Sequence, residues 1–192
     1  MAGEAVRDVL NHVANALSTL PSPFALAGGL ALAVWGYPRA TRDVDLLIGV
    51  ESSEFDTLLT TLTSHGCRPK HTPPLIPVGP YHIAQFLFTP PNEFYDVQFD
   101  LLLAENDLLK SALQRAQKQE VPGLDRPIRV LSCEDLMLLK LLAGRVLDLS
   151  DVAMLLRENH ASLDHAYMAV WLGKLNLEAA YEEARQSAFP EE

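Results

Sequence analysis

The chain has 192 residues, of which 48% are hydrophobic and 21% charged, and its formal net charge at pH 7 is -10. This length and composition fit a globular protein with a sizeable core, and the acidic charge argues against a protein that coats nucleic acid without sequence preference. No apolar run reaches the ~18 residues of a membrane span, and the acidic start does not resemble a signal peptide. We therefore expect a cytoplasmic protein with no membrane partner.

Hydrophobic periodicity and turn residues predict helices and strands that alternate as far as residue 131, and only helices beyond it. The predicted helices before that point are 4–19, 30–37, 51–66 and 104–119. The predicted strands are 24–29, which runs into a turn, then 44–50, 81–88, 93–103 and 127–131. The remaining predicted helices are 132–144, 148–159, 162–173 and 176–187. Five prolines between residues 67 and 80 predict an irregular loop.

This order of elements predicts an α+β (α/β) fold, in which a sheet flanked by helices is followed by a helical subdomain. The expected division is a core over residues 1–131 and a C-terminal helical subdomain over 132–192. The segment before residue 131 resembles a loop within the core, so the two parts are also compatible with a single packed unit.

Two aspartates, Asp43 and Asp45, lie two residues apart at the start of a predicted buried strand. Side chains at this spacing leave a strand on the same face, with their backbone positions ~6.5–7 Å apart. Two such carboxylates can converge on Mg²⁺, which typically takes one or two carboxylates and completes its shell with water and phosphate oxygens. Considered alone, the pair is equally compatible with two solvated aspartates at a strand end.

The residues before this pair add context. Gly28 and Gly29 lie between a predicted strand and a predicted helix, where free N–H groups and close backbone approach favour phosphate, although a tight turn without a ligand has the same pattern. Arg39 and Thr41 follow, and an arginine can bind phosphate oxygens through two hydrogen bonds. In an extended segment Arg42 points away from Thr41 and is compatible with a surface charge.

A third acid is expected near the attacking group of a metal-assisted phosphoryl transfer. The strand predicted over 93–103 offers Asp96 and Asp100 on one face. Asp100 directly precedes an apolar run, as Asp45 does, and is therefore the preferred candidate, with Asp96 second. An acid there could bind metal and take the proton of an acceptor hydroxyl.

These residues form the pattern GG-x9-R-x-T-x-D-x-D from Gly28 to Asp45, followed by the acidic strand at Asp100. The pattern resembles the signature of the polymerase-β-type nucleotidyltransferase superfamily, and particularly its minimal and abortive-infection toxin-like branch. A helix with Lys140 and a later Arg-x-x-Asp-x-x-Asp over 145–151 match further motifs of that branch. The resemblance covers about residues 24–156.

The resemblance implies a mixed sheet packed with helices, followed by a helical bundle. It implies an enzyme that transfers a nucleoside monophosphate from an NTP such as ATP to a hydroxyl and releases pyrophosphate. Two Mg²⁺ ions would be held by Asp43, Asp45 and Asp100, and Asp100 would also activate the acceptor. The residues implied in nucleotide binding are Gly28, Gly29, Arg39, Thr41, Lys140 and Asp148.

The C-terminal candidates also fit structural roles. Lys140 lies in an apolar helix, where a lysine can extend its ammonium group from the rim. Arg145 could pair with Asp148 or Asp151 across a helix start. Two positions depart from the branch: Gly29 lacks the hydroxyl of the usual serine, and Leu147 stands where a basic residue is common.

The sequence does not determine the acceptor, and tRNA, a protein and a small molecule are the alternatives. A toxin of a toxin–antitoxin system would modify tRNA or a protein and have an antitoxin partner. An antibiotic nucleotidyltransferase of the aminoglycoside or lincosamide type would modify a hydroxylated drug. A non-catalytic nucleotide-binding module with the same fold is the alternative from another class, and the three acids argue against it.

Overall fold

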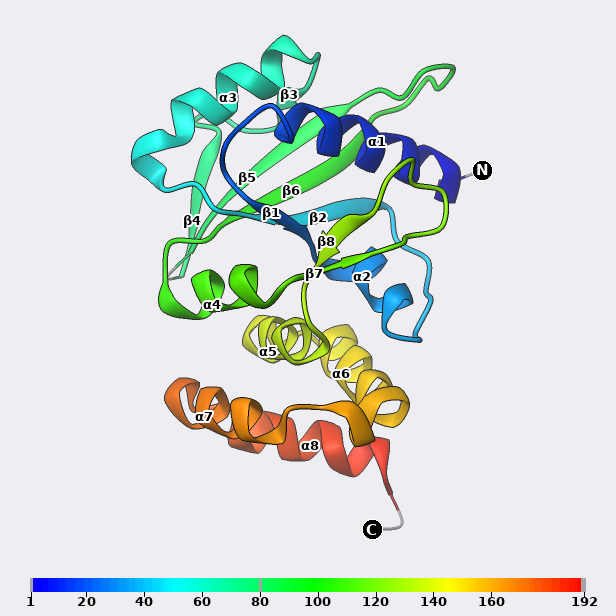
Figure 1. Cartoon of the computed structure of the whole chain (residues 1–192), viewed down its shortest axis with the longest axis vertical. Coiled ribbons are helices and arrows are strands. Elements are labelled where there is room, and N and C mark those ends of the chain that lie inside the picture. The colour runs from blue at the N-terminus through cyan, green and yellow to red at the C-terminus, as the bar shows by residue number, and fades with distance from the viewer. Residues whose placement is uncertain (1, 80, 191–192) are drawn as a thin grey trace. The chain divides into compact units, whose positions relative to one another are not determined.

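Figure 1 shows the chain as a computed structural model that describes residues 2–79 and 81–190. Backbone contacts divide it into two compact units. Unit 1 comprises Met1–Leu30 and Ala40–Leu131, and unit 2 comprises Ala31–Arg39 and Ser132–Glu192. The domain division after residue 131 stays a prediction, and contacts group the segment 31–39 with the C-terminal helices.

Unit 1 is built on a mixed β-sheet. Its strands are β1 (Phe24–Leu26), β2 (Asp43–Ile48), β3 (Arg68–Pro69), β4 (Leu75–Val78), β5 (Tyr81–Phe88), β6 (Val97–Leu103), β7 (Gln117–Gln119) and β8 (Ile128–Val130). They lie in the order β3-β5-β6-β2-β1-β8-β7, with β4 also paired to β5. The pairs β2–β6 and β1–β8 are parallel and the other pairs are antiparallel. The α+β fold with a mixed sheet is confirmed.

Four helical elements accompany the sheet of unit 1. They are α1 (Ala2–Leu17), the 3-10 turn η1 (Ser52–Glu54), α3 (Phe55–Ser64) and α4 (Asp107–Arg115). Figure 1 shows α1 and α3 on the same side of the sheet, and α1 contacts β2, β6 and α3. Apolar side chains at helical spacing on α1 are fully buried, among them Val9, Val13 and Leu17.

Strand β6 shows how the sheet separates its two faces. Val97, Phe99 and Leu101 are buried, whereas the alternating Gln98 and Asp100 are half-buried. Phe99 stacks on Phe86 of the neighbouring β5 with ring centroids 5.3 Å apart, which fixes the core side of both strands. The period of two therefore places the polar side chains of β6 on the opposite, more open face.

The largest differences from the sequence-based prediction lie in two segments. The proline-rich segment 67–80 contains β3 and β4, which pair with β5 at the outer edge of the sheet. Proline is tolerated in an edge strand because its missing N–H need not face a neighbour. The helix predicted over 104–119 ends at residue 115, and β7 follows it. The Arg129 guanidinium donates to the carbonyls of Leu113 and Ala116 at 2.7 and 3.1 Å, which satisfies the end of α4.

Unit 2 is helical after residue 131, as predicted. Its helices are α5 (Cys133–Ala143), α6 (Val146–Asn159), the 3-10 turn η2 (His160–Ser162), α7 (His165–Leu175) and α8 (Glu178–Ala188). Ser132 accepts the N–H of Asp135 at 3.2 Å and caps α5, and Gly144 ends that helix in the left-handed conformation. α6 contacts both α5 and α8. Among the described residues, no helix is long and apolar enough to span a membrane.

Candidate active site

The predicted acids lie together on two neighbouring parallel strands of unit 1. Asp45 on β2 is the register partner of Asp100 on β6, and Asp43 is the partner of Gln98. Adjacent strands lie about 4.8 Å apart, and register partners project from the same face. Because Asp43 and Asp45 are two residues apart, the three aspartates share one face of the sheet. We call them the acid row.

The two glycines lie directly against side chains that belong to or precede the acid row. α2 (Gly28–Val34) begins at Gly28, so both glycines lie in its first turn. A Cβ atom at Gly28 would stand 1.7 Å from Oδ2 of Asp45, and Gly28 has a φ of +56°. A Cβ at Gly29 would meet Oγ1 of Thr41 at 2.8 Å. Glycine is therefore favoured at position 28 by both conformation and space, and a Cβ at position 29 would require the Thr41 side chain to shift.

Hydroxyl and amide groups orient the other two acids of the row. The Thr41 hydroxyl donates to Oδ1 of Asp43 at 2.7 Å. Gln98 donates its side-chain amide to Oδ1 of Asp100 at 2.7 Å, and Gln85 on β5 donates to Oδ2 at 2.8 Å. These are neutral donors, so they orient Asp43 and Asp100 without cancelling their charge.

Gln85 and Gln98 are not among the site residues predicted from the sequence. Gln98 lies two residues before Asp100, so the strand period alone could have placed it on the same face. Gln85 reaches Asp100 because the two residues are register partners in the antiparallel β5–β6 pair. That register depends on the length of the connection between the strands, which periodicity does not determine.

Asp96, the second candidate for the third acid, lies outside the acid row. Asp96 precedes β6 and forms an ion pair with Arg68 at 2.5 Å. It also accepts from the Thr89 hydroxyl at 2.7 Å. These contacts hold Asp96 beside the outer strands, and Asp100 is the acid that the register places next to Asp45.

Three other predicted nucleotide contacts lie in unit 2 and belong to an ion cluster in which Lys140, Asp148 and Asp151 are buried. Lys140 Nζ lies 2.6 Å from Asp151 Oδ2 and 3.1 Å from Asp148 Oδ1. Arg39 binds Asp151 through Nε and Nη2, both at 3.0 Å. Arg145 pairs with Asp148 at 2.5 Å, which is the structural alternative expected for it. We call Arg39, Lys140, Arg145, Asp148 and Asp151 the ion cluster.

Burial and charge act in opposite directions on Asp148 in this cluster. Desolvation is the largest single influence and raises the pKa of Asp148. Hydrogen bonds and charge interactions from Arg145 and Lys140 together outweigh it, so the pKa lies below the ordinary aspartate value. Asp148 is therefore a buried carboxylate that stays ionised because two cations compensate its charge.

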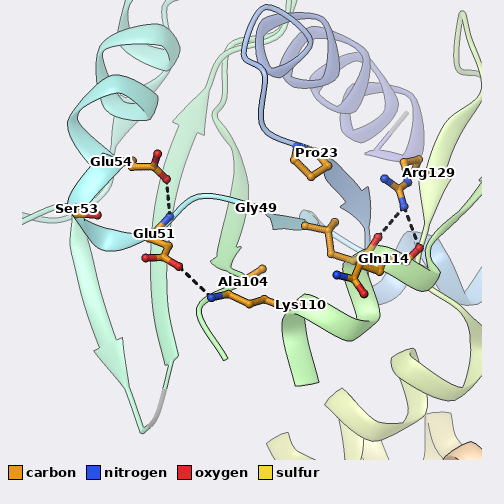
Figure 2. A pocket seen from close by; sticks show the side chains of 10 residues that line it. Pro23, Gly49, Glu51, Ser53, Glu54, Ala104, Lys110, Gln114 and Arg129 are labelled. Carbon is orange, nitrogen blue, oxygen red and sulfur yellow. Dashed lines mark hydrogen bonds and ion pairs between the residues drawn. The ribbon is translucent and has the colours of Figure 1, made fainter. Parts of the chain in front are cut away.

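A large cavity in unit 1 lies away from the acid row. It has a volume of about 600 Å³, and Figure 2 shows the side chains that line it. Gly49 and Ala104, which line it, directly follow β2 and β6, so the cavity is at the opposite ends of the strands from Asp43. Its two cations are engaged, Lys110 with Glu51 at 3.0 Å and Arg129 with the carbonyls at the end of α4. The cavity is therefore separate from the candidate active site.

The sequence matches a family model over residues 9–190, which is nearly its whole length. The model describes the nucleotidyl transferase AbiEii toxin of a type IV toxin–antitoxin system. This chain belongs to the AbiEii nucleotidyltransferase family. The resemblance seen in the glycine and aspartate motifs is confirmed, and the enzyme class of this AbiEii member is nucleotidyltransferase.

Solved structures support the same fold for this AbiEii member. An antigenic nucleotidyltransferase-like protein from Paracoccidioides brasiliensis is 19% identical, with a TM-score of 0.55 over 95% of this chain and 94% of that chain. The antibiotic-resistance factor ANT(2'')-Ia is 17% identical, with a TM-score of 0.58 over 97% and 99%. At these identities the likeness shows the fold alone. No curated protein matches the chain significantly in sequence.

The acid row of this AbiEii member fits Mg²⁺ in the chemistry of its donors. Among residues 2–79 and 81–190, no group of three or more His, Cys, Asp or Glu side chains is arranged to hold a metal ion. Mg²⁺ does not require such a cage, because it commonly binds one or two carboxylates and takes its other oxygens from water and substrate phosphates. Asp45 and Asp100, as register partners, supply two carboxylates of that kind.

Proposed function

We propose that the chain is a Mg²⁺-dependent enzyme that transfers a nucleoside monophosphate from an NTP to an acceptor hydroxyl. The single observation that carries this proposal is the register of Asp45 with Asp100 beside Asp43, in a chain of the AbiEii family. Three acids on one face of adjacent strands suit a reaction that concentrates negative phosphate charge at one point. We further propose that the protein acts in the cytoplasm.

Each acid of the row has a proposed role. Asp43, Asp45 and Asp100 would hold the Mg²⁺ ions. When bound, Mg²⁺ would neutralise charge that develops on the transferring phosphoryl group. Asp100 would also accept the proton of the attacking hydroxyl, because its carboxyl group lies next to Asp45 and is oriented by two amides.

The proposed nucleotide contacts that adjoin the acid row belong to unit 1. Gly28, Gly29 and Thr41 stand next to the acid row, where the backbone N–H groups of the glycines would meet phosphate oxygens. The space above Gly28 is taken by the Asp45 carboxylate, so this contact would be made by the backbone alone. Contacts from Arg39, Lys140 and Asp148 stay predictions, and a nucleotide would have to compete there with the ion cluster.

The test of this proposal is a transfer assay with labelled NTPs. The purified chain is incubated with Mg²⁺, each NTP in turn, and separate pools of tRNA, cell protein and hydroxylated antibiotics. We expect label in one pool with the wild type and none with the double variant Asp43→Asn/Asp45→Asn. Asp56→Asn is the matched control, because Asp56 is an exposed acid on α3 of the same unit. Absence of transfer to every pool by wild type would refute the proposal.

We also propose a toxin role with an antitoxin partner, which rests on the family's type IV toxin–antitoxin description. Induced expression should arrest growth without any drug, and the double aspartate variant should not. Drug resistance without growth arrest would instead favour antibiotic modification. If the double variant arrests growth as strongly as wild type, a non-catalytic nucleotide-binding module is the better account.

A further inference from the structure

Two series of side-chain hydrogen bonds reach Asp100 from the outer strands of the sheet. In one series, Lys70 Nζ donates to Oε1 of Gln98 at 2.6 Å, and Gln98 donates to Oδ1 of Asp100 at 2.7 Å. In the other, His71 Nε2 bonds to Oε1 of Gln85 at 2.8 Å, and Gln85 donates to Oδ2 of Asp100 at 2.8 Å. We call these the Lys70 arm and the His71 arm.

The chemistry of the end groups fixes the direction of both arms. Lys70 carries only donors and an ionised Asp100 only acceptors, so the Gln98 oxygen must face the lysine and its amide nitrogen the aspartate. Asp100 sets the orientation of Gln85 in the same way, and His71 then supplies the hydrogen at Nε2. The amide oxygen and the amide nitrogen of each glutamine therefore both have a hydrogen-bond partner, which fixes the orientation of the side chain.

The arms leave room for a cation at the carboxylate. An ionised carboxylate has about four lone-pair sites, two on each oxygen. The arms occupy one site on each oxygen and leave the others open. Hydrogen bonds from outer groups are a common means of orienting metal-binding side chains, and their loss typically lowers metal affinity or activity about 10- to 100-fold.

The arms also extend the site into a part of the chain that carries no predicted site residue. Lys70 and His71 follow β3, and the Lys70 N–H donates to the Gln85 carbonyl at 2.8 Å. Both side chains are exposed, whereas the two glutamines and Asp100 are half-buried. Lys70 and His71 can therefore be substituted without disturbing the core. The contribution of each outer residue can then be measured separately from that of its glutamine.

We propose that Gln85 and Gln98 are positioning residues that set the Asp100 carboxylate for cation binding, and that Lys70 and His71 set the glutamines. This inference rests on the proposed function. It identifies groups that act through Asp100 and do not themselves touch substrate. An alternative role, in which the arms only fasten the outer strands to the sheet, predicts lost stability with unchanged cation affinity.

The experiment measures Mn²⁺ affinity of the full chain by calorimetry, with kcat, KM for NTP and thermal unfolding in parallel. The variants are Gln98→Met and Gln85→Met, which keep the side-chain length and lose the amide, with Gln119→Met on β7 of the same sheet as control. We expect the two site variants to lose about 10- to 100-fold in Mn²⁺ affinity and in kcat. KM for NTP and the unfolding midpoint should stay near wild type in both, and Gln119→Met should match wild type throughout.

Double variants test the arms as units. Lys70→Met should weaken Mn²⁺ binding less than Gln98→Met, because it acts one step further from Asp100. Lys70→Met/Gln98→Met should equal Gln98→Met alone, since both changes break the same arm. Gln85→Met/Gln98→Met should combine the two losses. If Lys70 acts only through its charge, the loss of Mn²⁺ affinity in Lys70→Met/Gln98→Met should instead be the sum of the losses in the two single variants.

The outcomes separate this inference from the proposed function. Wild-type Mn²⁺ affinity in Gln85→Met and Gln98→Met overturns the positioning role, even if the wild type transfers nucleotide. No Mn²⁺ binding by the wild type overturns it as well. Loss of affinity in the variants of a chain that transfers nothing supports positioning while the proposed function fails. If Gln98→Met does not fold, Lys70→Met decides, and unchanged affinity there counts against the Lys70 arm.

Discussion

Aspartates occupy contrasting environments in the two units of the chain. In the acid row of unit 1, Asp43 and Asp100 are half-buried and accept from a hydroxyl and two amides. In the ion cluster of unit 2, Asp148 and Asp151 are buried and bind lysine and arginine. Neutral donors orient a carboxylate and leave its negative charge available to attract a cation. Lysine and arginine partners instead neutralise that charge.

From this contrast we predict that the aspartates of the acid row serve chemistry and those of the ion cluster serve stability. A carboxylate held by neutral groups at an open sheet face can bind Mg²⁺ without first releasing an ion pair. A buried carboxylate that is paired with cations is costly to separate from them. Substitutions in the acid row should therefore lower activity with little effect on stability, and substitutions in the ion cluster should do the reverse.

The largest effect is expected for Asp100→Asn. The change keeps the shape of the side chain and removes both the charge and the proposed proton acceptor. We expect nucleotide transfer to fall by about 10²- to 10⁴-fold. The urea midpoint of unfolding should remain near wild type, because the lost charge had no cationic partner among the described contacts. A large drop in that midpoint would place Asp100 with the structural acids.

Asp151→Ala should have the largest effect on stability. Asp151 is fully buried and bridges Lys140 to Arg39, so its removal breaks one ion pair of each of these two cations. Breaking a buried ion pair from one side typically costs about 3–5 kcal/mol. Urea unfolding measures this loss, with Glu182→Gln as the control from an exposed pair in the same unit. Equal, small losses in both variants would remove the contrast between the two regions.

Gly28→Ala should affect both properties, by a smaller amount. The new methyl group would enter the space of the Asp45 carboxylate and impose a left-handed conformation on an ordinary residue. The conformation alone costs about 1–2 kcal/mol. Gly79→Ala is the matched control, since Gly79 has a φ of +59° and no atom within 4 Å of the added Cβ. Stability should fall in both variants, and transfer activity should fall only in Gly28→Ala.

Local rules were enough to predict much of the acid row. The strand period places Asp43 and Asp45 on one face whatever the rest of the chain does. Asp100 could be predicted because it precedes an apolar run in the same way as Asp45. Each of these inferences depends on neighbours in sequence, so the fold could not easily overturn it.

The missed features depend on contacts that no local pattern encodes. Gln85 meets Asp100 through strand register, and Lys70 meets Gln98 because a proline-rich segment pairs with β5. The bond from Arg39 to Asp151 joins residues 112 positions apart. The lysine and aspartates of the ion cluster were visible in the sequence, but their mutual pairing depended on how α5 and α6 pack.

The smallest expected effect is a pH dependence that belongs to Asp148. Its folded pKa lies below the ordinary value of about 3.9, so ionised Asp148 stabilises the folded state above that pH. The contribution is lost as pH falls through the folded pKa, where the carboxylate takes up a proton in both states. The difference in free energy of unfolding between wild type and Asp148→Asn should therefore shrink from pH 7 to pH 3. Because Asp148 is buried, 0.5 M salt should leave that difference nearly unchanged at pH 7, whereas exposed pairs such as Glu182–Arg185 are screened. A difference that is constant with pH would show that Asp148 stabilises the folded state without its charge.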